Sequence, residues 1–140
     1  MKKRIRLLIG MIAFVGSTAF PPLSWSADIT PEIVRAAAVE FIHSTEQNEG
    51  VFTLFDEKIV TNRQLKLERV YDRIGITEDH YYVCIAMEDL ETGDVLDVDF
   101  DVKTIGGTPK VLDSRTRIHK VNGRARYTYD EDNNIIPRRP

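Results

Sequence analysis

The stretch VLDVDFDVKTI, residues 95–105, decides the fold. Apolar and polar side chains alternate along it without interruption, which is the pattern of a β-strand that buries one face and exposes the other. The sequence therefore predicts an antiparallel sheet with one face on a hydrophobic core and one polar face. The apolar positions are Leu96, Val98, Phe100 and Val102, and the polar ones are Asp97, Asp99, Asp101 and Lys103.

The polar face of this strand predicts how it pairs with the next strand, expected over residues 111–121. With a loop over 106–110, Ile105 lies opposite Val111, and every polar pair that follows joins opposite charges. Such pairs contribute about 0.2 to 1 kcal/mol each, and a slipped register would bring like charges together. We interpret them as a structural charge ladder that sets the register. Its pairs are Lys103 with Asp113, Asp101 with Arg115, Asp99 with Arg117, and Asp97 with His119.

Three further strands are expected before this pair and one after it. Short segments rich in β-branched and aromatic residues, separated by turn residues, predict strands over 51–60, 64–74 and 80–90. The Asn-Gly pair at 122–123 predicts a type I′ turn into a sixth, edge strand over 124–129. Both faces of the third strand are apolar, so its register leaves two alternatives: Val83, Ile85 and Met87 face the core, or Cys84 and Ala86 do.

One helix is expected ahead of the strands. Thr30 is its predicted N-cap and Pro31 its first residue, with Ile29 placed to pack on Val34. Gly50 can end it in the left-handed conformation. The predicted fold is therefore α+β, with one N-terminal helix packed on a five- to six-stranded antiparallel meander. The apolar stripe of the helix is Ile33, Val34, Ala37, Ala38, Phe41 and Ile42.

The first 26 residues have the order of a secretory signal peptide. A basic start is followed by an apolar run over 7–15, and Ser24-Trp25-Ser26 supplies a small-x-small cleavage site before Ala27. As a helix the apolar run would span about 14 Å, against roughly 30 Å for a bilayer core. We expect cleavage after Ser26, or after Ala27 as a near alternative, export to the periplasm or the medium, and no membrane anchor afterwards. The predicted organisation is a signal peptide over 1–26, one domain over 27–129 and a flexible polar tail over 130–140.

Charge and cysteine usage narrow the function classes. Cleavage after residue 26 of the 140 would leave a mature chain of 114 residues. This mature chain keeps 15 of the 19 basic residues and all 22 acidic ones, so its net charge is −7. That balance disfavours nonspecific binding to nucleic acid, so no nucleic-acid partner is expected. Cys84 is the sole cysteine, which excludes an intramolecular disulfide. We expect it to be a buried apolar residue, with a reactive thiol or a disulfide-linked dimer as the alternatives.

Candidate catalytic and metal-binding residues all have a simpler structural interpretation. Asp97, Asp99 and Asp101 with His119 resemble a hard-metal or general-base cluster, but the charge ladder accounts for them without a cation. Glu40 and His43 have the Glu-x-x-His spacing of di-iron bundles, although only one copy is present. The chain contains no recognisable nucleophile setting, phosphate-binding loop or zinc motif. We therefore predict no catalytic residues, no cofactor and no bound metal.

The last predicted hairpin is locally basic in an otherwise acidic protein. Half of its charges are expected to pair with the strand over 95–105, and the others protect an edge strand from self-association or form a surface for an anionic ligand or an exported protein partner. The residues of this predicted partner surface are Lys120, Arg124, Arg126, Tyr127 and Tyr129.

The order of one helix and then an antiparallel meander, over about 30–129, resembles the cystatin-like layout. That layout is shared by protease inhibitors, small exported modules and, with more helices, the nuclear transport factor 2-like proteins. The glycine of the inhibitors' first hairpin is missing from QLKLE, residues 64–68, and Trp25, the sole tryptophan, lies in the signal segment. The resemblance thus implies a fold without protease inhibition. We predict a non-enzymatic exported domain that acts by binding; the alternative is a carrier or enzyme with a pocket between helix and sheet.

Overall fold

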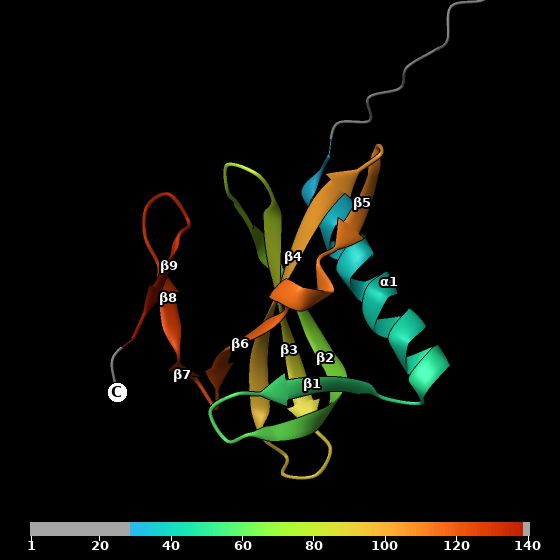
Figure 1. Ribbon diagram of the computed structural model, residues 1–140, viewed down its shortest axis with the longest axis vertical. Helices are drawn as coiled ribbons and strands as arrows, with labels where there is room; N and C mark the ends of the chain where they lie inside the picture. The colour runs from blue at the N-terminus through green and yellow to red at the C-terminus, as the bar shows by residue number, and fades with distance from the viewer. Residues whose placement is uncertain (1–28, 139–140) are drawn as a thin grey trace, which may run out of the picture.

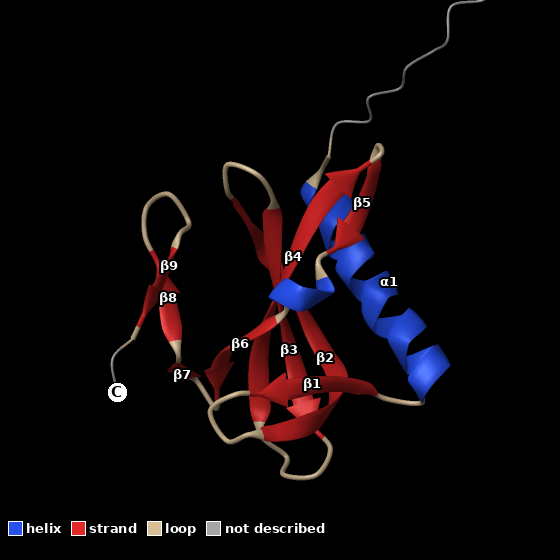
Figure 2. Cartoon of the chain, viewed as in Figure 1, coloured by secondary structure: helices blue, strands red, loops and turns tan. Residues whose placement is uncertain are grey.

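The computed structural model describes residues 29–138. The predicted signal peptide and its cleavage site lie outside the described residues. Figures 1 and 2 show one helix against one side of a twisted antiparallel sheet, with a small hairpin on the other side. The elements are α1 (Pro31–Glu49), β1 (Phe52–Asp56), β2 (Thr61–Ile76), β3 (Tyr81–Asp89), β4 (Val95–Ile105), β5 (Thr108–Val111), the short helix η1 (Asp113–Arg115), β6 (Arg117–Val121), β7 (Arg124–Ala125), β8 (Tyr127–Tyr129) and β9 (Ile135–Pro137).

The helix begins and ends where its sequence signals predict. The Thr30 side chain accepts a hydrogen bond of 3.4 Å from the backbone N–H of Ile33, and Pro31 is the first helical residue. At the other end Gly50 takes a left-handed conformation with φ of 84°, and its N–H donates to the carbonyl of Glu46 at 2.8 Å. Val34, Ala38 and Ile42 are fully buried against the sheet. The amphipathic stripe therefore packs as expected.

The seven-stranded sheet has the order β1-β2-β3-β4-β6-β7, with β5 also paired to β4. The α+β fold with a single helix on an antiparallel sheet is confirmed, but the strand expected over 111–121 is wrong as one element. Gly106 and Gly107 both have positive φ and form a tight turn that pairs Ile105 with Thr108 rather than with Val111. The chain then leaves the sheet through η1 and returns as β6, so two short strands share β4.

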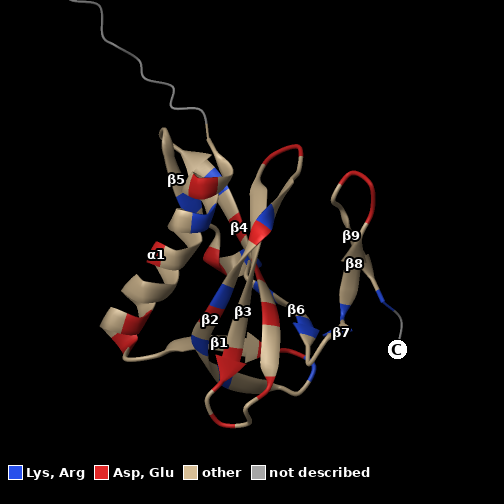
Figure 3. Cartoon of the chain, turned by 180° about the vertical axis from the view of Figure 1, so that it is seen from behind, with Lys and Arg blue, Asp and Glu red and all other residues tan. Residues whose placement is uncertain are grey.

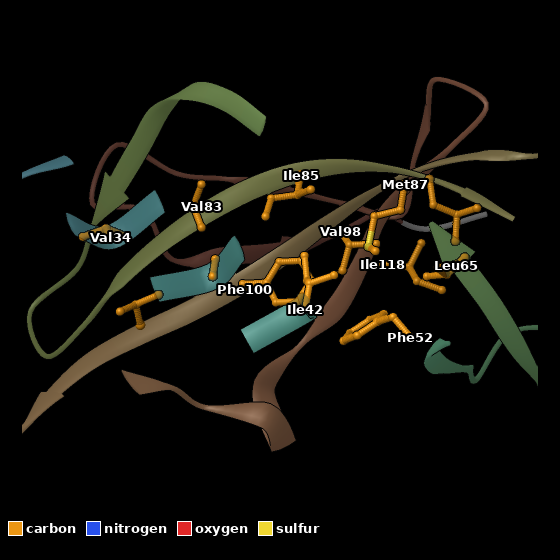
Figure 4. Close-up of a cluster of buried hydrophobic side chains, with 13 residues drawn as sticks. Val34, Ile42, Phe52, Leu65, Val83, Ile85, Met87, Val98, Phe100 and Ile118 are labelled. Atoms are coloured by element: carbon orange, nitrogen blue, oxygen red, sulfur yellow. The ribbon is translucent and has the colours of Figure 1, made fainter. Parts of the chain in front are cut away.

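The β3–β4 register selects one of the two alternatives that the sequence left open. Val83 lies opposite Phe100 and Ile85 opposite Val98, so this set faces the helix. Cys84, opposite Asp99, belongs to the other face. Figure 4 shows these apolar side chains beside Val34 and Ile42 of α1, and all of them are fully buried. The buried core cluster is Val34, Ala38, Ile42, Phe52, Leu65, Val83, Ile85, Met87, Leu96, Val98, Phe100, Val102 and Ile118.

The register predicted by the charge ladder is confirmed at its centre and wrong at its ends, and the central ion pair is wrong as well, because Arg117 forms its ion pair with Asp101. Asp99 pairs with Arg117 as expected, but a β-bulge then places Asp97 opposite Lys120 instead of His119. The bulge has a physical cause: Ile118 and Val121 are three residues apart, and the extra residue lets both pack on the core side. The pairs Asp101 with Arg115 and Lys103 with Asp113 are also wrong, because the tight turn pairs Lys103 with Lys110.

The C-terminal segment forms a hairpin of its own. The turn at Asn122-Gly123 has positive φ at both residues, 48° and 78°, as a type I′ turn requires, and β7 pairs with β6. The sixth strand expected over 124–129 is nevertheless broken, because β8 pairs with β9 in a separate two-stranded sheet. Residues 130–137, expected to be a flexible tail, complete this hairpin. In Figure 1 the hairpin lies on the side of the sheet opposite α1.

Candidate functional site

The face of the sheet that points away from α1 carries the polar side chains of β3, β4 and β6. The β8–β9 hairpin lies over part of this polar face and leaves a pocket of about 550 Å³ beside it. Figure 3 shows basic residues on β7 and acidic residues at the turn between β8 and β9. We call this the polar-face pocket. It is lined by Tyr71, Arg73, Tyr82, Cys84, Asp97, Asp99, His119, Lys120, Ala125, Thr128, Tyr129, Asp130 and Asn133.

Asp99 is the centre of the polar face and is fully buried. The hydroxyls of Tyr127 and Tyr129 both donate to its Oδ2 atom, at 2.6 Å and 2.5 Å. Burial and the negative charge of Asp99 raise the pKa of both tyrosines, so each stays protonated and remains a donor. Its other oxygen, Oδ1, has no hydrogen-bond partner among the described residues. One oxygen of this carboxylate therefore accepts two hydrogen bonds, whereas the other is buried without a partner.

His119 and Cys84 flank the Asp99 carboxylate. The His119 ring stacks on Tyr127 at 4.7 Å between centroids, and its Nδ1 atom is 3.7 Å from Oδ2 of Asp99. Cys84 lies directly across from Asp99 on β3. Burial, reinforced by the negative charge of Asp99, raises the pKa of the Cys84 thiol, so the sulfur is protonated at neutral pH. The cysteine expected to be a buried apolar residue is thus half-buried on the polar face.

Tyr82 anchors the hairpin over the sheet. Its ring stacks on Tyr129 with centroids 4.4 Å apart, and its hydroxyl donates to Asn133 at 3.0 Å. Gly75, its neighbour on β2, makes room for the ring, because a Cβ atom there would lie 1.8 Å from a ring carbon of Tyr82. The pocket wall is therefore built from contacts between β2, β3 and the C-terminal hairpin.

The two other aspartates of β4 are occupied by protein groups. Asp97 accepts a hydrogen bond from Tyr71 at 3.0 Å and lies 3.5 Å from the Lys120 ammonium. Asp101 forms an ion pair with Arg117 at 3.0 Å, and its Oδ2 atom lies 3.2 Å from Nε2 of His80. The cluster of Asp97, Asp99, Asp101 and His119 considered from the sequence is thus divided among separate partners. A second pocket of about 780 Å³ lies beyond Asp101, between η1, the loop that holds His80 and the hairpin.

Three of the five residues of the predicted partner surface are held inside the structure. Arg126, directly after β7, forms a bidentate pair with Asp56 of β1, at 2.7 Å and 2.8 Å. The pair links the two strands at opposite edges of the sheet. Tyr127 is buried, and both it and Tyr129 bind Asp99. Lys120 lines the polar-face pocket, and Arg124 is exposed. The five side chains therefore do not form one continuous surface.

Arg126 belongs to a buried ion network that the sequence analysis missed. Arg63, 5% exposed, donates to Asp56 and to Asp89, each at 2.8 Å, and to Asp94 at 3.0 Å. Burial opposes ionisation of Asp56, but hydrogen bonds from Arg126 and Arg63 outweigh it, and the pKa of Asp56 lies well below its usual value. None of its residues lines the polar-face pocket, and we assign the network a structural role.

Comparison of the chain with protein-family models, with curated proteins and with solved structures finds no significant match. Over residues 29–138, no helix combines the length and the apolar character needed to cross a membrane. His43, from the Glu-x-x-His spacing, is exposed on α1, away from the polar face. The site is therefore interpreted from its own geometry.

Proposed function

We propose that this chain is an exported, non-catalytic domain that acts by binding a small polar ligand in the polar-face pocket. The observation that carries the proposal is the convergence of Tyr71, Tyr82 and Tyr129 with the half-partnered carboxylate of Asp99 around one hollow. Its volume of about 550 Å³ is in the range of small-molecule sites. Aromatic walls with a few convergent polar groups are the usual composition of such sites.

Binding fits these residues better than catalysis. The tyrosines that touch Asp99 have raised pKa values and are hydrogen-bonded, so neither is a ready proton acceptor. Burial and the negative charge of Asp99 also raise the pKa of Cys84, so its sulfur is a thiol rather than a thiolate and a poor nucleophile. A rigid set of donors and acceptors around a pocket is what recognition of a ligand requires.

The other hypotheses have weaker support. A carrier or enzyme with its pocket between helix and sheet would need space where Ile42, Phe100 and Val98 are fully buried against one another. A partner surface on the outer hairpin would depend on Lys120 and Arg124, because Arg126 is paired with Asp56. Export and a cystatin-like layout remain part of the proposal, supported by the order of the first 26 residues and by the helix that precedes the sheet.

A fragment screen tests the location of binding. Small polar and aromatic fragments are titrated into the exported protein, and amide chemical shifts are followed by NMR. We expect the responding amides to cluster at Cys84, Asp97 and Thr128, with dissociation constants that weaken when Lys120→Ser is introduced.

The matched control is Arg124→Ser, which removes an exposed cation of the same hairpin outside this pocket. Equal weakening by both variants would place binding on the outer hairpin surface instead. Fragments that cluster in the second pocket, around His80 and Arg117, would refute the assignment. Arg126 is left intact in all variants, because its loss would break the buried pair with Asp56.

A further inference from the structure

Three side chains of the kinds that bind transition metals meet in the polar-face pocket. Cys84 comes from β3, Asp99 from β4 and His119 from β6, and all three line the pocket. One potential ligand atom of each, a sulfur, a carboxylate oxygen and a ring nitrogen, lies within 4.8 Å of the other two. We propose that this triad binds a divalent transition-metal ion and that Zn²⁺ is the ion that suits its donors best.

The buried carboxylate supports a cation independently of the cysteine. Asp99 is fully buried, and its Oδ1 atom has no hydrogen-bond partner in the part of the chain that the structure describes. Buried polar atoms in native proteins are nearly always paired, so an unpaired buried carboxylate oxygen in a residue that lines a pocket indicates a place for a donor or a cation. A metal ion at this point would satisfy the oxygen that the tyrosines leave free.

The surroundings of the triad are those of an organised metal site. Tyr127 and Tyr129 bind Oδ2 of Asp99, which fixes the orientation of the carboxylate and leaves Oδ1 for the ion. Stacking on Tyr127 limits rotation of the His119 ring. Zinc bonds of about 2.0 to 2.3 Å place tetrahedral ligand atoms roughly 3.5 Å apart. Because Asp99 and His119 are restrained and already lie 3.7 Å apart, we expect the Cys84 side chain to make most of the adjustment, of about 1 Å at the 4.8 Å limit.

The donor set selects the class of metal. Sulfur and imidazole nitrogen favour Zn²⁺ and similar ions, whereas Mg²⁺ and Ca²⁺ prefer sites made of oxygen alone. An all-carboxylate site is not available on β4, because Asp97 and Asp101 are held by Lys120 and Arg117. Three protein ligands leave the fourth tetrahedral position of a zinc ion for water or for a ligand in the pocket.

The metal site deepens the proposed function and rests on it, because the ion would reach its ligands through the same pocket. It also departs from the sequence-based expectation of no metal. The sequence brings Asp99 and His119 together on the polar face but leaves the register of residues 80–90 open, so it does not place Cys84 opposite Asp99.

Titration of the exported protein with Zn²⁺ alone tests the inference. We expect calorimetry to show one ion per chain, and substitution of Co²⁺ to produce a thiolate-to-cobalt charge-transfer band in the near ultraviolet. Cys84→Ser and His119→Asn should each weaken zinc binding by at least about tenfold. His43→Asn, which removes an exposed imidazole of α1, is the matched control and should leave the affinity unchanged.

Several outcomes would overturn the site. Zinc affinity equal in Cys84→Ser and the unmodified protein would do so, as would a cobalt complex without the charge-transfer band or displacement of zinc by equimolar Mg²⁺. The cobalt spectrum needs no variant, so it decides the question even if a substitution impairs folding. Fragment binding without zinc binding would refute this inference alone, whereas zinc binding without pocket-bound fragments would refute the proposed small-ligand function.

Discussion

Replacing Asp99 by asparagine is expected to destabilise the protein by about 2 to 4 kcal/mol. An exposed ion pair would contribute about 1 kcal/mol or less, which is the value a surface ladder implies. Asp99, however, is fully buried and accepts two tyrosine hydrogen bonds. Hydrogen bonds to a charged group contribute about 1.5 to 3 kcal/mol each and neutral ones about 0.5 to 1.5, so loss of the charge weakens the pair by roughly 2 kcal/mol.

The introduced amide adds a second effect. In Asp99→Asn the side-chain nitrogen would take the place of Oδ1, and an unsatisfied buried donor there costs about 1 to 3 kcal/mol more. Relief of the desolvation of a buried charge offsets part of this sum, which gives the stated range.

Urea unfolding at neutral pH, followed by far-ultraviolet circular dichroism, measures the change. The matched control is Asp113→Asn on the exposed η1 turn, expected to change stability by about 0.5 kcal/mol or less. If Asp99→Asn were as mild as that control, the buried tyrosine–carboxylate cluster would not exist as described.

Three other outcomes are expected. Phe100→Ala should cost about 3 to 5 kcal/mol in the same assay because Phe100 is fully buried, whereas Phe55→Ala, at a side chain 52% exposed, should cost about 1 kcal/mol or less. The depressed pKa of Asp56 means that its carboxylate stabilises the fold at neutral pH and that this contribution is lost as the pH falls from about 3.9, the unfolded pKa, toward the folded value. Melting temperatures of the unmodified protein and Asp56→Asn should therefore converge in acid, and a constant difference between them would contradict the ion network. The intact mass of the exported protein should correspond to a chain that begins at Ala27, and a mass that retains Met1 would contradict cleavage and export.

The features of the fold that the sequence predicted are those with local causes. The helix limits follow from Thr30, Pro31 and Gly50, each of which satisfies or ends the backbone hydrogen bonds of its own turn. The buried face of β4 follows from strict alternation, and the turn at 122–123 from two residues that tolerate positive φ. These signals act within a few residues, so one sequence is enough to find them.

The differences between the predicted and the observed strand pairing have identifiable signals in the sequence. Gly106 and Gly107 alone form the turn after β4, so the loop expected over 106–110 was too long and the register moved. The bulge in β6 was signalled by the apolar pair Ile118 and Val121, whose spacing of three breaks the period of two. A spacing rule applied to that strand would have moved His119 away from Asp97.

The candidate site depends on contacts between distant segments, which no local pattern contains. Asp99 was correctly placed on the polar face, but its burial is caused by Tyr127 and Tyr129, which reach it only because the hairpin folds back over the sheet. The place of Cys84 beside it required the β3–β4 register, which the apolar character of both β3 faces left open. For the same reason Arg126 was predicted to be a surface cation although it pairs with Asp56, seventy positions away.

A crystal structure of the exported protein grown with Zn²⁺ tests most directly the claim that Cys84, Asp99 and His119 form a metal site on the polar face. The account predicts an anomalous zinc peak about 2.0 to 2.3 Å from the Cys84 sulfur, an Asp99 oxygen and a His119 nitrogen, with the fourth position open to the pocket. Zinc found only at other sites, with Oδ1 of Asp99 hydrogen-bonded to a protein donor, would contradict it.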